Sequence, residues 1–151
     1  MATKAVTAKA VKLQRGDGAT PTEGFTTIAE ITSESGPNES AEQIDVTSFD
    51  SPAREFVAAL VDSGEVAFDM NFIGENAQQQ GLRTDLRAGT KRNFKLIVPD
   101  RVLEASCSTC AFAAIVTDLS GPQASGVDSA ITQSCTLKVS GTPAWTYATP
   151  V

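Results

Sequence analysis

The sequence predicts a mainly β protein, an antiparallel β-sandwich or partly closed barrel with one α-helix packed against it. Short segments of alternating apolar and polar residues recur along the chain, separated by clusters of Gly, Pro, Asn and Ser. Only one segment has the spacing of an amphipathic helix. Many strands and one helix are typical of a sheet that buries one face under a helix. The seven predicted strands cover residues 10–15, 25–33, 42–48, 65–73, 93–98, 110–118 and 128–140.

The clearest strand runs from residue 65 to residue 73. Apolar Val66, Phe68 and Met70 alternate with Glu65 and Asp69, so opposite faces of this strand differ in polarity. We therefore expect one face of this strand to pack against a core, and the other to carry carboxylates into solvent. Such a surface either repels an anion or meets a basic partner.

The helix is predicted between Asn76 and Ala88. Asn76 is a suitable N-cap residue, because its side-chain oxygen can accept a hydrogen bond from a free backbone N–H of the first turn. Leu82 and Leu86 are four residues apart and lie on the same face of a helix. Gly89 follows as the expected C-terminal stop.

The remaining segments are predicted to be irregular. Residues 49–64 form a long connection, in which the apolar stretch 56–60 is expected to pack against the body of the protein. We expect a single domain over 1–151, with a flexible N-terminal arm at 1–8 and a loosely held C-terminal tail at 144–151.

Charge is unevenly distributed along a chain whose net charge is −6. Eleven acidic residues and one base, Arg54, lie between Glu23 and Asp69, whereas residues 76–101 hold six bases and two acids. One interpretation is a well-solvated surface whose charges happen to segregate. The other is a protein with acidic and basic faces that attract each other between copies, which fixes the register of association.

The residue inventory disfavours catalysis. The chain has no histidine, which removes the usual activation of serine and cysteine nucleophiles and the commonest metal ligand. Cys107 and Cys110 form a C-x-x-C pair, but only Cys135 remains to complete a zinc site that needs four ligands. We expect one exposed turn cysteine with the others buried, and no enzyme activity, catalytic residue, metal or cofactor.

Neither a membrane nor a tight complex with DNA is predicted. No apolar run approaches the roughly 20 residues that cross a bilayer, and the first ten residues lack the apolar core of a secretory signal. The protein is therefore expected in the cytoplasm where it is made. A pI near 4.6 disfavours tight binding of nucleic acid, although Lys91 and Arg92 are adjacent bases.

Several segments, in this order and spacing, resemble the major tail tube proteins of long-tailed bacteriophages of the siphophage type. The C-x-x-C pair departs from that family, which usually has a plain turn there. The resembling segments are Ile-Asp-Val-Thr-Ser at 44–48, Ala-Arg-Glu-Phe at 53–56, Gly-Glu-Val-Ala-Phe at 64–68, Phe-Lys-Leu-Ile-Val-Pro-Asp at 94–100 and Thr-Leu-Lys-Val-Ser-Gly-Thr-Pro at 136–143.

The resemblance implies a structural virion protein. Six subunits would form a ring, and rings would stack head to tail into a hollow tail tube that conducts DNA and the tape measure protein. Tail terminator and tail-tip proteins would be further partners, and DNA would pass through the lumen without specific binding. The tube would be assembled in the cytoplasm of the bacterial host, and residues 49–64 would reach a neighbouring subunit or ring.

Two sets of candidate residues follow from this resemblance and from the charge pattern. Acidic candidates for the lumen, where they would repel DNA, are Glu30, Asp45, Glu65 and Asp69. Candidates for contacts between subunits or rings are Arg54, Glu55, Phe56, Arg83, Arg87, Lys91 and Arg92.

Two alternatives stay open at this point. The first is a monomeric β-sandwich binding module, such as a virion decoration or adhesion domain. The second is the related tube of bacterial contractile secretion machines, which would work together with a sheath.

Overall fold

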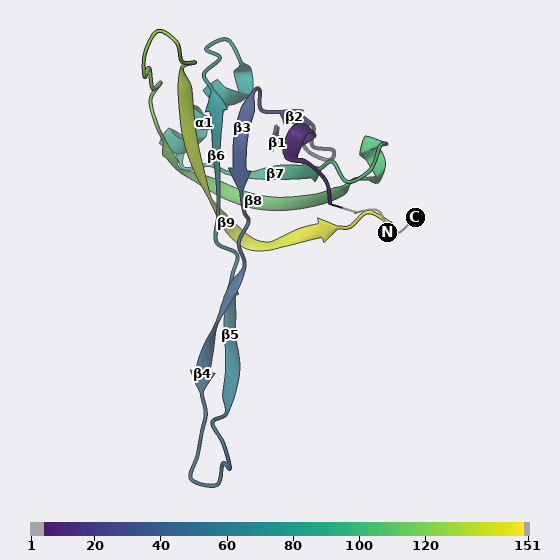
Figure 1. Cartoon of the computed structure of the whole chain (residues 1–151), viewed down its shortest axis with the longest axis vertical. Helices are drawn as coiled ribbons and strands as arrows, with labels where there is room; N and C mark the ends of the chain where they lie inside the picture. Colours follow the sequence, from purple (N-terminus) through teal and green to yellow (C-terminus); the bar gives the residue numbers. More distant parts are fainter. Residues whose placement is uncertain (1–4, 150–151) are drawn as a thin grey trace.

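A computed structural model describes residues 5–149. The prediction of a mainly β, antiparallel fold with one flanking helix is confirmed (Figure 1). The strands are β1 (Lys12–Gly16), β2 (Phe25–Thr27), β3 (Ile31–Ser35), β4 (Ser40–Asp45), β5 (Phe56–Asp62), β6 (Glu65–Asn71), β7 (Lys91–Val98), β8 (Ser108–Leu119) and β9 (Thr132–Thr146). The helix α1 spans Ala77–Ala88, and two short 3₁₀ turns cover Ala8–Ala10 and Glu104–Ser106.

Seven strands form one antiparallel sheet in the order β2-β1-β7-β8-β9-β6-β3. The sheet curls so far that its two edge strands are joined by only three residues, Ile28 to Glu30. The Ile28 N–H donates to Leu13 O on β1 at 2.9 Å, and the Asn71 N–H donates to Glu30 O at 2.9 Å. This short segment spans the two edges, so the sheet is a partly closed barrel with a seam between β2 and β3.

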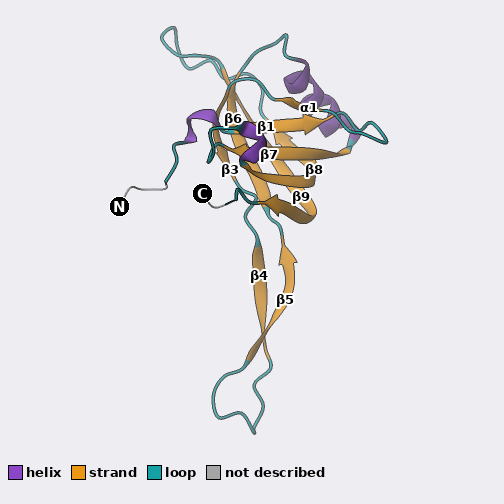
Figure 2. Cartoon of the chain, turned by 90° about the vertical axis from the view of Figure 1, so that its right-hand side faces the viewer, coloured by secondary structure: helices purple, strands orange, loops and turns teal. Residues whose placement is uncertain are grey.

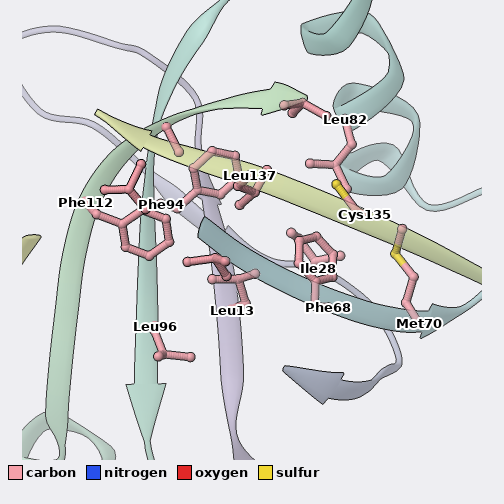
Figure 3. Close-up of a cluster of buried hydrophobic side chains, with 14 of the residues drawn as sticks. Leu13, Ile28, Phe68, Met70, Leu82, Phe94, Leu96, Phe112, Cys135 and Leu137 are labelled. Atoms are coloured by element: carbon pink, nitrogen blue, oxygen red, sulfur yellow. The ribbon is translucent and has the colours of Figure 1, made fainter. Parts of the chain in front are cut away.

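The core lies inside the curled sheet (Figure 3). Phe68, Phe94 and Leu137 come from three different strands and are at most 2% exposed. Leu82 of α1 enters the same cluster, so the helix covers the core side of the sheet. The alternation seen in the sequence of β6 therefore places its apolar residues as predicted, with Glu65 and Asp69 on the opposite face.

The helix begins and ends as its sequence predicts. The Asn76 side chain accepts a hydrogen bond from the Gln79 N–H at 3.1 Å, and Gly89 has the left-handed φ of 66°. Arg15 lies so close to the helix that a Cβ atom at Gly81 would be 2.6 Å from its Cζ. Gly81, which weakens an isolated helix, therefore makes room for this side chain.

A buried ion cluster fixes the helix to the sheet. Asp85 is 1% exposed and accepts hydrogen bonds from Arg15 Nε on β1 and Arg92 Nε on β7, both at 2.8 Å. Gln79, also buried, accepts a bond from the Ile73 N–H and donates to the carbonyl oxygens of Ala29 and Asn71. These two polar anchors set the position of α1 above the sheet.

Three predictions about strand bounds are wrong. The predicted strand 25–33 is two strands, because Glu30 turns the chain at a φ of 52°. The third predicted strand, 42–48, corresponds to β4 at 40–45, which begins two residues earlier than predicted. The last strand, predicted at 128–140, covers Thr132–Thr146, and its end is extended because residues 144–146 pair with β8. Of the predicted arm at 1–8 and tail at 144–151, residues 1–4 and 150–151 lie outside the described residues.

The predicted connection 49–64 is the largest difference. It contains β5, which pairs only with β4 and forms a long hairpin that projects away from the body (Figures 1 and 2). The apolar stretch 56–60 does not pack against the body, because its pairing partner β4 is equally remote from the core. At the base, a Cβ atom at Gly64 would lie 2.2 Å from Asn38 O, so glycine permits the close crossing of the two chains there.

We expect Asp85→Asn to lower the free energy of unfolding by about 3 kcal/mol, because it leaves two arginines against the buried face of α1 without a counter-charge. Urea denaturation followed by circular dichroism measures this loss. Asp128→Asn, an exposed acid in the loop before β9, is the matched control and should change stability by less than about 0.5 kcal/mol. Equal effects of the two substitutions would contradict the anchoring role of Asp85.

Candidate assembly surfaces

The hairpin carries apolar surface on a segment without a core. Seven large apolar side chains between Ser40 and Asp62 are exposed, and Phe49 at the tip and Leu60 on β5 are almost completely so. Isolated two-stranded hairpins are marginally stable in water, and contiguous exposed apolar surface marks an interaction site. The seven residues are Ile44, Val46, Phe49, Phe56, Val57, Leu60 and Val61.

Local hydrogen bonds nevertheless order the tip of the hairpin. Asp45 accepts a bond from the Thr47 N–H at 2.9 Å and pairs with Arg54 at 2.8 Å, and the pKa of Asp45 is lowered mainly by its hydrogen bonds to Thr47. The Ser51 hydroxyl donates to Glu55 at 2.6 Å. The tip is thus a preformed loop, which loses little conformational entropy when it binds a partner.

A pocket of about 250 Å³ is lined by residues that follow β6 and by residues of α1. Figures 1 and 2 show α1 at the end of the body away from the hairpin. Phe72 and Ile73 form the apolar part of the pocket, and Arg83 and Arg87 of the helix line it as well. Neither arginine makes an ion pair within the described residues. The pocket therefore combines an exposed aromatic ring with two cations that have no counter-charge.

The outer face of the curled sheet is not covered by the helix. We call this the uncovered face; short polar and small side chains dominate its centre, with acids toward β6 and lysines toward β7. Asp69 accepts hydrogen bonds from the hydroxyl groups of Ser33 at 3.1 Å and Ser134 at 2.6 Å. Its members are Ser33, Glu65, Ala67, Asp69, Lys91, Asn93, Lys95, Ala113, Ile115, Ser134, Thr136 and Lys138.

The structure separates the four candidate lumen acids into three places. Glu65 and Asp69 lie together on the uncovered face, whereas Glu30 lies in the turn between β2 and β3. Asp45 lies on the hairpin, where it is paired with Arg54. Within one chain, Glu65 and Asp69 are thus the two that share a face, and the role of all four acids in a lumen stays a prediction.

The candidate contact residues are distributed over both ends of the molecule. Arg54, Glu55 and Phe56 belong to the hairpin, and Arg83 and Arg87 line the pocket at the opposite end. Lys91 begins β7 and is exposed. Arg54 and Arg92 are each ion-paired within the chain, Arg54 with the exposed Asp45 and Arg92 with the buried Asp85. The contacts of these residues between subunits stay predictions.

Sequence reasoning missed the apolar tip and the polar anchors of the helix. Phe49 carried a signal, since a phenylalanine between Ser and Asp in a turn has no core to enter. Gln79 and Asp85 carried none, because a polar residue on a helix is exposed far more often than buried.

The cysteines provide no reactive or metal-binding group. All three are free and buried, so the prediction of an exposed turn cysteine is wrong: Cys107 lies under the loop that follows β7. Burial raises the pKa of Cys110 to about 11 and of Cys135 to about 12, which suppresses their thiolate forms. Among residues 5–149, no group of three or more potential ligands is arranged to hold a metal, and no helix is long and apolar enough to cross a membrane.

The family profile described as lambda phage tail tube protein matches residues 15–146. The chain belongs to the lambda phage tail tube protein family, and its role is that of a structural tail tube protein. No curated protein sequence matches it significantly.

Solved structures share the fold at low sequence identity. The tail of a gene transfer agent particle, refined helically with C6 symmetry, is 18% identical at a TM-score of 0.72, over 94% of this chain and 99% of that one. The SPP1 tail tube is 13% identical at a TM-score of 0.64, over 89% of this chain and 75% of that one. The tube-terminating cap of the anti-feeding prophage is 10% identical at a TM-score of 0.75, over 98% of this chain and 95% of that one.

The seam of the barrel contains a buried acid. Glu34 of β3 lies beside Phe68 on the core side of the sheet, and Lys9 and Val11 line the same small pocket. In the described part of the chain, Glu34 Oε1 is the one buried side-chain polar atom that lacks a hydrogen-bond partner. Burial raises the pKa of Glu34 from its ordinary 4.5 to about 7. The protonated carboxyl is therefore favoured in the folded protein.

We expect Glu34→Gln to stabilise the protein at pH 8 by about 1 kcal/mol and to have little effect at pH 4, because water screens part of the cost of burying this half-buried carboxylate. Because the folded-state pKa is raised, ionisation favours the unfolded chain, and wild-type stability falls as pH rises from about 4.5 to about 7. Urea denaturation of both proteins across this range measures the difference. A difference that does not vary with pH would contradict the assignment. Glu39→Gln, an exposed acid nearby in the sequence, is the control.

Proposed function

We propose that this protein forms six-membered rings that stack head to tail into a hollow tail tube. The observation that carries the proposal is the hairpin, whose large apolar side chains are exposed in the described structure. A contact between two different surfaces, the hairpin of one copy and the body of another, repeats without closing along an axis and generates a filament. The C6 symmetry of the gene transfer agent tail, which shares the fold, supports the number six.

Edge strands support the closure of the ring. β2 and β3 each leave one side of their backbone unpaired at the seam of the barrel. Exposed edges invite pairing with another chain, and enclosure within an assembly removes this hazard. The segregation of charge across the uncovered face, acids at β6 and lysines at β7, gives adjacent copies complementary sides.

We further propose that the uncovered face lines the bore and that DNA and the tape measure protein pass along it. The helix covers the other side of the sheet, so this face is the one available for a wall. Short Ala, Ser and Thr side chains make it smooth. Glu65 and Asp69 repel phosphate groups, and Lys138 on the same face is neutralised by Asp62 at 3.0 Å.

The remaining partners follow from the tube itself. The two ends of the tube require a terminator at one side and tail-tip proteins at the other. The fold is similar to that of a tube-terminating cap, which supports a contact between the tube protein and a terminator of the same fold. Assembly takes place in the cytoplasm of the bacterial host, and the finished tube resides in the virion tail. No catalytic step is assigned to the protein in this role.

Purified protein should assemble into tubes at high concentration, because contacts with a second copy would remove the exposed apolar side chains of the hairpin from water. Negative-stain electron microscopy detects rings or tubes of uniform width. Protein that stays monomeric at every concentration, and does not assemble when tail partners are added, would favour the alternative of a monomeric binding module.

Glu65→Lys should permit tubes but slow the ejection of DNA, because a lysine in the bore binds phosphate groups with release of counterions. The rate of DNA release from particles that carry the variant measures this, and the delay should shrink as salt is raised. Asp128→Lys gives the same change of net charge away from the sheet and is the control. Ejection at the wild-type rate would place Glu65 outside the bore.

A further inference from the structure

The tip of the hairpin presents one aromatic side chain within an acidic segment. Phe49 is fully exposed, and Asp50 next to it makes no ion pair within the described residues. The only base on the hairpin, Arg54, is already bound to Asp45. The tip is therefore an apolar knob beside a carboxylate that has no counter-charge in its own chain.

The pocket at the other end of the body has the opposite character. Phe72 is exposed there although it continues the apolar alternation of β6, and the backbone N–H of Phe72 is held by Ile131 O at 2.8 Å. Gln79 fixes the adjoining turn through the Ile73 N–H, so the pocket is preformed. Arg83 and Arg87 give it positive charge.

The size of the pocket suits a single aromatic side chain. An engineered cavity of about 150 Å³ binds benzene, and this pocket measures about 250 Å³. It is smaller than the roughly 300 to 1,000 Å³ that is usual for sites of drug-sized ligands. A phenylalanine together with a neighbouring carboxylate fits it better than a free cofactor does.

We propose that this pocket is the receptor for the hairpin tip of a second copy in the next ring, with Phe49 seated against Phe72 and Asp50 paired with Arg83 or Arg87. The proposal rests on the stacked tube proposed above and assigns the two surfaces that join successive rings. Aromatic pairing and desolvation of Phe49 supply the attraction, and the ion pair sets the register.

The placement of the two surfaces agrees with head-to-tail stacking. β6 starts at Glu65, directly after the hairpin, and ends at Asn71, directly before Phe72 of the pocket. The seven residues of β6 therefore separate the base of the hairpin from the pocket by roughly 20 Å. Figures 1 and 2 show the hairpin at one end of the molecule and α1 at the other. A contact between these ends propagates along the axis.

Phe49→Ala should raise the protein concentration needed for tube assembly at least about tenfold, because buried aromatic anchors carry a large share of interface energy. Sedimentation of tubes over a concentration series measures this threshold. Val102→Ala, which removes an equally exposed apolar side chain after β7, should leave it unchanged. Circular dichroism of both variants should match the wild type, since neither side chain is in the core.

A disulfide cross-link tests the pairing itself. The double variant Asp50→Cys with Thr84→Cys places one thiol at the tip and one at the pocket, and the three native cysteines are buried. Mild oxidation of assembled tubes should give ladders of linked chains on a non-reducing gel. Asp50→Cys with Val102→Cys should give none.

The outcomes separate this inference from the proposed function. Tubes of wild-type protein together with an unchanged threshold for Phe49→Ala overturn the inference, and the tube role stands. Absence of the 50–84 cross-link in tubes, or equal cross-linking of the 50–102 pair, also overturns it. Wild-type protein that never assembles, alone or with tail partners, overturns both.

Discussion

The hairpin of β4 and β5 is the constraint on which the rest of this molecule depends. Two strands paired only with each other bury little apolar surface and are marginally stable alone. This hairpin nevertheless carries Phe49 and Leu60 into solvent, whereas the core is closed elsewhere. The apolar side chains of the hairpin are therefore left in solvent in the single chain, and this exposure is the observation behind the proposed assembly.

The body would hold both ends of the proposed contact between rings in a fixed relation. β6 is central to that role, because it starts at the base of the hairpin and ends at the pocket. The helix beside the pocket cannot shift easily, since Asp85 ties it to β1 and β7 and Gln79 ties it to the end of β6. A rigid body of this kind converts a local contact at one end into a regular axial repeat.

The same body is compatible with the proposed use of one surface for passage and another for assembly. Apolar residues on the inner side of the curled sheet leave its outer side free for short polar side chains, and the barrel needs no ligand site in its interior. Glu34 at the seam is an exception, because an acid without a full set of partners lies among core residues. Glu34 belongs to the open edge strand β3, where the proposed assembly places a neighbouring subunit.

The sequence by itself determined the elements with strong local signals. Alternation predicted β6, and capping residues predicted the helix from Asn76 to Gly89, because these patterns depend on contacts within a few residues. Only the tertiary structure decided that the apolar run at Phe56 lies outside the core, that Glu30 divides one strand into two, and that Asp85 is buried between two arginines. Burial depends on which distant segments a residue meets, and apolar residues look the same in a sequence whether they face their own core or the surface of another copy.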